Sequence, residues 1–203
     1  MEAGIYFVTS EVVSEGRSTL DIAKAALDGG IKLIQLREKD IPVNSFFKLA
    51  LELRKLTMLH DALLIINDRP DVAMAVGADG VHLGQDDFPY EKARKLAPDL
   101  IVGVSTHSVK EAVEAEKNGA SYINIGPIFE TATKKWNEEF LGMEGLKEIS
   151  AAVDIPFTVM GGIKRNQIPD LRSAGATAIA LVTAITAAND PQSAAEDLLK
   201  TIG

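Results

Sequence analysis

The feature of this sequence that most limits its fold is a series of short apolar runs that recurs along the chain. The runs are only a few residues long and rich in Val and Ile. Nearly continuous apolar runs of this length are typical of parallel strands that are buried on both faces. The segments between them, such as 20–27, 109–117 and 194–200, place apolar residues at helical spacing. The sequence therefore predicts alternating strands and helices. The expected strands are 5–8, 31–36, 63–66, 81–83, 101–104, 122–125, 157–160 and 179–182.

Glycines mark the helix ends in a regular way. Gly30, Gly77, Gly119 and Gly175 precede the second, fourth, sixth and eighth expected strands. Glycine just past a helix takes the left-handed conformation that stops the helix. Any α/β protein can use glycine in this way, but the placement before every second strand favours a closed, repeating array.

The length agrees with this array. Eight strand–helix units in 203 residues give about 25 residues per unit, which fits a compact (β/α)8 TIM barrel. The rival fold is a doubly wound open sheet, which usually has fewer strands and often a G-x-G-x-x-G turn after the first. Here Thr9, Ser10 and Glu11 follow the first strand instead. We therefore expect one α/β barrel domain over residues 1–203.

Composition excludes several classes of protein. The chain has no cysteine, which excludes disulfides, thiolate zinc sites and cysteine nucleophiles. Its formal net charge of −8 argues against binding nucleic acid. No apolar run approaches the length of a membrane span, and the first residues lack the pattern of a secretory signal. We expect a cytoplasmic protein without membrane or nucleic-acid partners; a homo-oligomer is left open.

Polar residues gather after the expected strands, where barrels carry their active sites. Gln35, Arg37 and Lys39 alternate after the second strand, so they project the same way if the strand extends that far. Two cations and an amide at the mouth suit an anionic, phosphorylated ligand. The alternative is that Arg37 and Lys39 only pair with nearby carboxylates such as Asp68.

Carboxylates follow the next two strands. Asp68 comes after the third strand, and Asp86 and Asp87 come after the fourth. Without cysteine, and with scattered histidines, these oxygen donors predict Mg²⁺ held by one or two carboxylates plus substrate phosphates. The alternative is that Asp86 or Asp87 caps the helix that Pro89 opens.

The second half of the chain predicts a separate phosphate site. Gly161 and Gly162 follow the seventh strand and Thr183 follows the eighth, as in the backbone phosphate sites of barrels. The alternative for the glycines is a tight turn. Thr131, Thr133 and Lys134 lie on a long loop that also carries Trp136. We interpret this loop as a lid, with a solvated surface loop as the alternative.

Four single residues complete the candidates. Ser105 is the best-placed hydroxyl, although it can also serve a turn. Asn67 either binds substrate or caps a turn. His82 lies within a strand and is interpreted as structural. His107 lies at the mouth, and the sequence offers it no obvious nucleophile or carboxylate with which to form a catalytic triad.

These motifs, taken in order, resemble the thiamine-phosphate synthase family over nearly the whole chain, from Tyr6 to the last helix. The motifs are Gln35-Leu36-Arg37-Glu38-Lys39-Asp40, Ile66-Asn67-Asp68-Arg69, His82-Leu83-Gly84-Gln85-Asp86-Asp87, Gly103-Val104-Ser105-Thr106-His107, Gly126-Pro127, Thr131 with Thr133-Lys134-Lys135, Gly161-Gly162-Ile163 and Val182-Thr183-Ala184-Ile185.

The resemblance implies a reaction and assigns roles. An aminomethylpyrimidine diphosphate joins a thiazole phosphate, or its carboxylate, to give thiamine phosphate and pyrophosphate. Asp68 and Asp87 would hold Mg²⁺, and Ser105 would lie near the pyrimidine. The residues implied for the pyrimidine diphosphate are Gln35, Arg37, Lys39, Asn67 and Lys134. The residues implied for the thiazole phosphate are Thr131, Thr133, Gly162, Val182 and Thr183. The catalytic group would be Arg37, Lys39, Ser105 and Lys134.

One departure from the family pattern lies in the loop after the sixth strand. Phe129-Glu130-Thr131 stands where the family usually has Pro before the threonine, and it is similar to the related thiazole tautomerases. That family usually has His where Pro127 stands and lacks the full cation and carboxylate sets. The synthase is therefore favoured. A thiazole tautomerase and a non-catalytic regulator that binds the thiazole phosphate are the alternatives.

Overall fold

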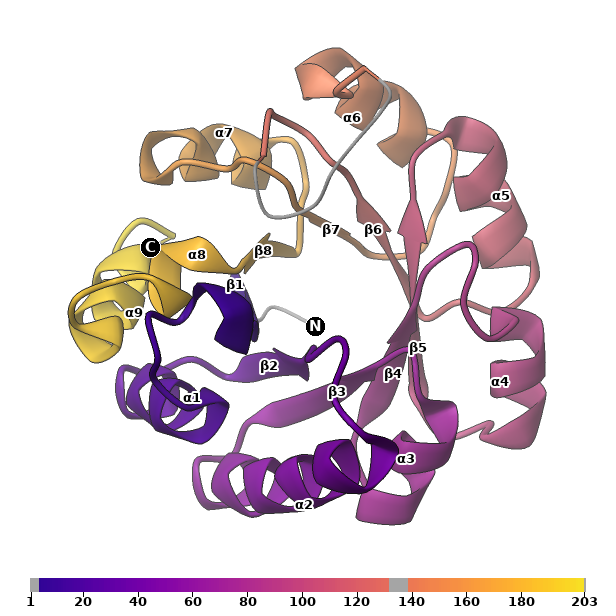
Figure 1. Ribbon diagram of the computed structural model, residues 1–203. Helices are drawn as coiled ribbons and strands as arrows, with labels where there is room; N and C mark the ends of the chain where they lie inside the picture. Colours follow the sequence, from indigo (N-terminus) through magenta and orange to yellow (C-terminus); the bar gives the residue numbers. More distant parts are fainter. Residues whose placement is uncertain (1–3, 132–138, 203) are drawn as a thin grey trace.

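The computed structural model describes residues 4–131 and 139–202. Eight parallel strands pair in sequence order, and β1 pairs with β8 to close the barrel (Figure 1). All eight strands expected from the sequence are present, and the TIM barrel is confirmed. The strands are β1 (Gly4–Val8), β2 (Leu33–Leu36), β3 (Leu63–Asn67), β4 (Gly80–Leu83), β5 (Ile101–Thr106), β6 (Tyr122–Ile125), β7 (Phe157–Val159) and β8 (Ala178–Leu181).

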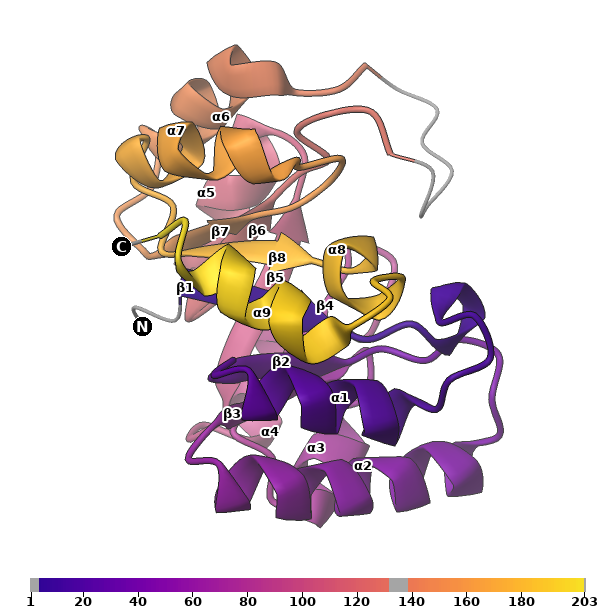
Figure 2. The ribbon, with the colours of Figure 1, turned by 90° about the vertical axis from the view of Figure 1, so that its left-hand side faces the viewer.

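Helices surround this barrel on the outside (Figures 1 and 2). The helices of the described residues are η1 (Glu11–Val13), α1 (Thr19–Asp28), α2 (Val43–Leu59), α3 (Pro70–Val76), α4 (Tyr90–Leu96), α5 (Val109–Lys117), α6 (Gly142–Ser150), η2 (Arg165–Gln167), α7 (Ile168–Ser173), α8 (Thr183–Thr186) and α9 (Pro191–Leu199). Ser18, Ser108 and Asp190 cap α1, α5 and α9 by accepting hydrogen bonds from backbone amides of the first turn.

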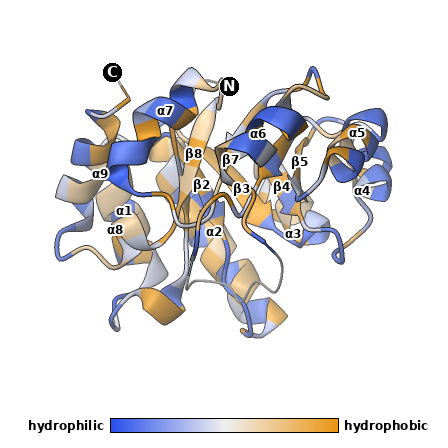
Figure 3. Cartoon of the chain, turned by 90° about the horizontal axis from the view of Figure 1, so that it is seen from above, coloured by the Kyte–Doolittle hydropathy of each residue, from blue (hydrophilic) through white to orange (hydrophobic). Residues whose placement is uncertain are grey.

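The apolar strands pack on both faces, which explains why their sequences are so uniformly hydrophobic. Outward-facing residues such as Ile5, Phe7 and Ile34 join the helices in one large core. Inward-facing residues such as Tyr6, Leu33 and Tyr122 form a second cluster inside the barrel. Figure 3 shows the result as hydrophobic strands enclosed by helices whose outer faces are largely hydrophilic.

The glycine prediction is confirmed by the backbone. Gly30, Gly77, Gly119 and Gly175 all have positive φ, between 66° and 99°. Gly77 itself is the left-handed C-cap of α3. These turns let each following strand start directly after its helix, which keeps the units short.

The second strand is shorter than the sequence suggests. β2 begins at Leu33 and ends at Leu36, and Asp40 has a φ of 64°. Arg37 and Lys39 therefore lie on a loop, and the condition for their alternation with Gln35, a strand that extends to Lys39, is not met. Their placement at the mouth comes from the loop and its contacts.

The connections that follow the strands gather on one side of the barrel, opposite the two labelled ends of the chain (Figure 2). This side is the mouth of the barrel. No helix within the described ranges is long and apolar enough to cross a membrane.

Candidate active site

A cavity of about 400 Å³ opens at the mouth, next to the carboxyl ends of β1 and β5–β8. Several residues predicted from the sequence line this cavity and so lie close to one another. These are Arg37, Ser105, Thr131, Gly162, Val182 and Thr183. His107 also lines the cavity; its Nδ1 contacts the Gly126 carbonyl and its amide donates to Glu111 at 2.6 Å.

One wall of the cavity is built from closely approaching backbones. Gly161 and Gly162 have φ values of 102° and 62°. A Cβ on Gly162 would overlap the carbonyl oxygens of Phe129 and Glu130, and the Phe129 amide donates to the Gly161 carbonyl at 3.0 Å. The tight turn and the cavity wall are therefore the same feature. Only glycine permits the positive φ together with so close an approach of the neighbouring backbone.

The adjacent wall is the start of α8. Val182 is its N-cap residue, and Val182, Thr183 and Ala184 all line the cavity. Backbone amides and a hydroxyl beside a double-glycine turn form a surface suited to an anionic group.

The loop after β2 lies on the other side of the mouth. The Arg37 amide donates to Thr9 Oγ1 at 2.9 Å, which ties this loop to the end of β1, and Arg37 lines the cavity. Lys39 Nζ lies 2.5 Å from Asp68 Oδ2, so the pairing considered as an alternative exists for Lys39. Lys39 and Asp68 thus form a charged pair just beyond the strands.

Asp68 and Asp87 come together, as the sequence predicts. Their carboxyl groups hydrogen-bond to each other, and the Gly84 amide donates to Asp87 at 2.7 Å. Burial raises the pKa of Asp68, and the bond with Asp87 raises it further against the effect of Lys39. Burial alone would raise the pKa of Asp87, but the bonds from Asp68 and Gly84 outweigh it and lower that pKa. The pKa of Asp68 therefore lies above that of Asp87.

The capping alternative is wrong for both candidate residues. α4 starts after Pro89, and no side chain accepts a hydrogen bond from its first turn. Asp86 is exposed to solvent, while Asp87 turns back to the Gly84 amide.

The carboxylate pair fits a hard divalent cation. Two like-charged groups close enough to share a proton repel each other when both are ionised, and a cation removes that repulsion. Within residues 4–131 and 139–202, no cluster of three His, Asp or Glu residues forms a complete protein cage. Asp68 and Asp87 can thus supply part of a coordination sphere, with the remaining positions left for a ligand.

A hydrogen-bonded chain inside the barrel was not foreseen from the sequence. Gln35 Nε2 donates to the Tyr6 hydroxyl at 2.7 Å, and the Tyr6 and Tyr122 hydroxyls lie 2.9 Å apart. His82 joins Tyr122 through Nδ1 at 3.0 Å and Ser105 through Nε2 at 2.9 Å. The chain therefore connects the barrel interior with Ser105 at the cavity.

This chain decides how two candidates are interpreted. Burial lowers the pKa of His82 to about 4, so its imidazole is neutral, which agrees with a structural role. Gln35 is 3% exposed and is not among the residues that line the cavity. Asn67 is also nearly buried, and pairs with His82 in the β3–β4 register.

Sequence reasoning missed some residues of the site. Asn124 lines the cavity and donates to Thr158 Oγ1 at 2.6 Å, and Met160 and Lys164 line it as well. The period-two pattern of the strands was the available signal, because Tyr6, Gln35, Tyr122 and Asn124 are polar interruptions at inward-facing positions. Thr133, Lys134 and Trp136 lie outside the described residues.

The fold and the mouth together define a (β/α)8-barrel enzyme with a carboxylate-bearing side and a glycine-rich side. The family model described as "Thiamine monophosphate synthase" matches residues 5–185. The chain belongs to this family, which confirms the resemblance found in the sequence.

Individual relatives agree with this assignment. A thiamine-phosphate synthase of Clostridium novyi is 42% identical over 96% of both chains, and one of Pyrococcus abyssi is 46% identical over 88% of this chain and 86% of its own. The solved thiamine phosphate pyrophosphorylase of Pyrococcus furiosus is 37% identical, with a TM-score of 0.90 over 99% of this chain and 96% of its own. A 3-hexulose-6-phosphate synthase, at 21% identity and a TM-score of 0.68, supports the fold alone.

Proposed function

We propose that this protein is a thiamine-phosphate synthase, which couples an aminomethylpyrimidine diphosphate to a thiazole phosphate and releases pyrophosphate. The observation that carries the proposal is the division of the mouth into two sides. Asp68, Asp87 and Lys39 gather at the ends of β2–β4, whereas the Gly161–Gly162 turn and Thr183 bound the cavity beside β7 and β8. A reaction between two phosphorylated molecules needs two such anion sites next to each other.

On the first side, charge neutralisation drives the departure of pyrophosphate. Lys39 pairs with Asp68, and Arg37 lines the cavity. Both cations therefore lie where they can bind the diphosphate oxygens. Mg²⁺ held by Asp68 and Asp87 would neutralise negative charge on the leaving group. Loss of one such preorganised contact costs about 3 kcal/mol of barrier, or roughly a hundredfold in rate.

The reaction needs no protein nucleophile. The amino group of the pyrimidine can stabilise positive charge on the neighbouring methylene carbon, so the carbon–oxygen bond breaks before the thiazole nitrogen attacks. The electron pair of that bond leaves with pyrophosphate, and the nitrogen lone pair forms the new bond. Ser105 lies at the cavity where it can orient the pyrimidine, with its oxygen held by His82.

On the second side, backbone groups hold the thiazole phosphate. The Gly161–Gly162 turn and the segment Val182–Thr183 form adjoining walls of the cavity, and Thr131 lies on the facing loop. A thiazole whose phosphate is bound there would lie in the cavity next to Ser105, and the two reacting atoms would approach in a fixed orientation. The family resemblance alone assigns Thr133 to this site and Lys134 to the pyrimidine diphosphate.

The test is pyrophosphate release by the purified protein with both substrates, measured with Mg²⁺ and then with EDTA. We expect release that requires both Mg²⁺ and the thiazole phosphate, with thiamine phosphate as the product. Addition of excess Mg²⁺ after EDTA should restore it. Release that continues unchanged in EDTA would contradict the proposed role of the carboxylate pair.

The two alternative functions give different results in the same assay. A thiazole tautomerase would convert its thiazole substrate without any pyrimidine diphosphate. A regulator would bind the thiazole phosphate without turnover. Either result would overturn the proposed synthase function.

A further inference from the structure

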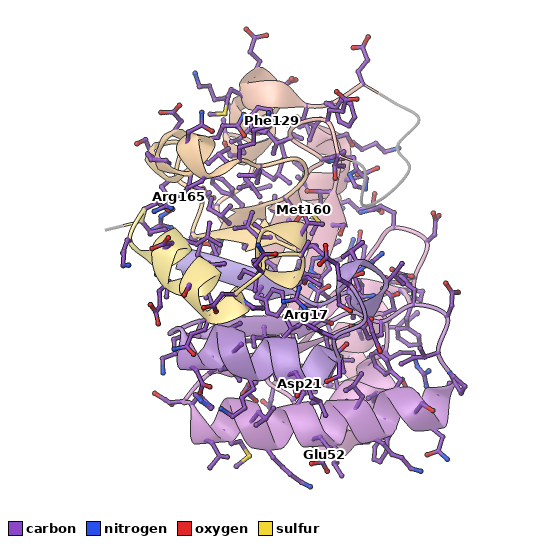
Figure 4. All side chains as sticks on the ribbon, turned by 60° about the vertical axis from the view of Figure 1, so that its left-hand side comes forward. Arg17, Asp21, Glu52, Phe129, Met160 and Arg165 are labelled. Atoms are coloured by element: carbon purple, nitrogen blue, oxygen red, sulfur yellow. The ribbon has the colours of Figure 1, made fainter. Side chains whose placement is uncertain are left out.

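Arg17 holds the far end of the short helix that borders the cavity. It lies in the segment between β1 and α1, and Figure 4 shows it between α1 and the α8–α9 segment. Its Nη1 donates to the Ala188 carbonyl at 2.7 Å and its Nη2 to the Thr186 carbonyl at 2.9 Å. Its Nε donates to the Ser14 carbonyl at 3.0 Å. One guanidinium thus binds three carbonyls from two separate segments.

The chemistry of a helix end explains this arrangement. The last carbonyls of a helix lack partners within the helix and carry partial negative charge. A guanidinium suits them because its donors diverge in a rigid plane and its charge is permanent. Ser14, which is fully buried, also donates from Oγ to the Arg17 carbonyl at 2.6 Å, so the arginine backbone is fixed as well.

The other end of the same helix borders the cavity. α8 contains only Thr183–Thr186, and its first residues, with Val182 before them, form the wall beside the Gly161–Gly162 turn. The Thr186 amide donates to the Val182 carbonyl and the Ala187 amide to the Thr183 carbonyl, both at 3.0 Å. A shift of the carbonyls that Arg17 holds is therefore transmitted through one turn of helix to the cavity wall.

We propose that Arg17 is a positioning residue for the thiazole phosphate, acting through α8. The proposal rests on the proposed synthase function. Arg17 is not among the residues that line the cavity, so it acts on the ligand only through the backbone of Val182, Thr183 and Ala184. Within the described residues, the Arg17 side chain hydrogen-bonds to Ser14, Thr186 and Ala188 and to no residue at the ends of β2–β4, so the diphosphate side of the mouth is expected to be unaffected.

The chain offers a matched control in Arg94, which makes a similar clamp at the other face of the barrel. Its Nε donates to the Gly119 carbonyl at 2.9 Å, its Nη1 to the Leu100 carbonyl at 2.7 Å and its Nη2 to Ser121 Oγ at 2.6 Å. These partners precede β5 and β6, at the strand ends opposite the cavity. Loss of this clamp affects folding stability without reaching the mouth.

The experiment compares the steady-state kinetics of Arg17→Gln, Arg17→Lys and Arg94→Gln with the unchanged protein. For Arg17→Gln we expect the KM for the thiazole phosphate to rise about tenfold, equivalent to about 1.4 kcal/mol of binding. The KM for the pyrimidine diphosphate and kcat at saturation should stay within about twofold. The KM of Arg17→Lys for the thiazole phosphate should lie between those of the unchanged protein and Arg17→Gln. One ammonium group cannot reach all three carbonyls that the guanidinium binds. Arg94→Gln should leave both KM values unchanged.

A second measurement separates this proposal from the proposed function. Calorimetric titration with the thiazole phosphate alone should show weaker binding to Arg17→Gln by a similar factor. Absence of pyrophosphate release by the unchanged protein would overturn the synthase function, while the titration would still test Arg17.

Three results would overturn the positioning role of Arg17. They are an unchanged KM for the thiazole phosphate, an equal rise in both KM values, and the same kinetic change in Arg94→Gln. If Arg17→Gln does not fold, the comparison is made on Arg17→Lys, which keeps the charge, and equal changes of both KM values there would also contradict the proposal.

Discussion

At the scale of single residues, Asp68 is the most informative position in the mouth. It contacts both Lys39 and Asp87, and its backbone has a left-handed φ of 63°. Asparagine tolerates that conformation well, so Asp68→Asn removes the charge without straining the loop. We expect kcat/KM to fall about a hundredfold and the dependence on Mg²⁺ to weaken.

The control for this substitution is Asp86→Asn, at an exposed carboxylate next to the site. It removes the same charge from the same surface and should change kcat/KM by less than about twofold. Equal losses in the two variants would show that the overall negative potential, and not the Asp68–Asp87 pair, is responsible.

His82 leads to a prediction about pH and stability. Burial lowers its pKa from 6.5 to about 4 in the folded protein. Below about pH 6.5 the unfolded chain therefore takes up a proton that the folded protein refuses, and the free energy of unfolding falls as the pH falls. The expected contribution is about 2 kcal/mol between pH 7 and pH 5.

Urea unfolding at the two pH values measures this effect. In His82→Gln the amide can still bond to Tyr122 and Ser105 but does not titrate. The decrease in the free energy of unfolding from pH 7 to pH 5 should therefore be about 2 kcal/mol smaller in this variant. An identical pH dependence in both proteins would mean that His82 is not held neutral in the fold.

The same residues show what the sequence could predict at this scale. The pairing of Asp68 with Asp87 follows from strand order alone, since neighbouring parallel strands end at the same edge. The Lys39–Asp68 bond does not follow from strand order, because it depends on where β2 ends. The burial of Gln35 does not follow either, because its partner Tyr6 lies within an apolar run that gives no sign of a hydrogen bond.

At the scale of secondary-structure elements, β5 and β6 fit together through one glycine. A Cβ on Gly103 would overlap the ring of Tyr122 on the next strand. That ring also stacks edge-on against Tyr6, with centroids 6.3 Å apart, and its hydroxyl bonds to His82. Gly103→Ala should therefore displace Tyr122 and destabilise the protein by about 3 kcal/mol.

Denaturant unfolding of Gly103→Ala and Gly77→Ala tests this packing. Gly77 has a φ of 66°, and nothing lies within 4 Å of its would-be Cβ, so alanine there costs only backbone strain of about 1 kcal/mol. Similar losses at the two positions would contradict the tight fit of Tyr122 against β5.

The strands and helices themselves were predictable because burial on both faces leaves a uniform apolar signal. The limits of β2 were not, because the expected strand 31–36 includes Ile31 and Lys32, which precede β2 in the structure. The role of Gly103 was also hidden, since a glycine inside a strand does not reveal which neighbour approaches it.

At the scale of the whole molecule, the sequence pattern predicted the closed barrel, because eight short units leave no unpaired edge when β1 meets β8. The sequence also predicted two separate anion sites, but not the loop contacts that divide the mouth into two sides. That division depends on loops whose positions are set by individual bonds, such as Arg37 to Thr9 and Phe129 to Gly161.

Closure has a consequence for ligand-linked stability. The carboxylate pair lies on β3–β4 and the phosphate wall on β7–β8, yet all eight strands belong to one ring. If the ring unfolds as one unit, a ligand on either side stabilises the whole. Mg²⁺ with pyrophosphate, or the thiazole phosphate, should each add about 2.7 kcal/mol at a hundred times its Kd. The corresponding rise in Tm is roughly 5–10 °C.

Thermal unfolding with each ligand alone and with both together measures this coupling. A single transition that moves upward with either ligand, with free energies that add when both are present, is expected for one cooperative barrel. Asp68→Asn should lose the shift caused by Mg²⁺ and pyrophosphate while keeping the shift caused by the thiazole phosphate. Two separate transitions, each sensitive to one ligand, would show instead that the two halves of the ring unfold independently.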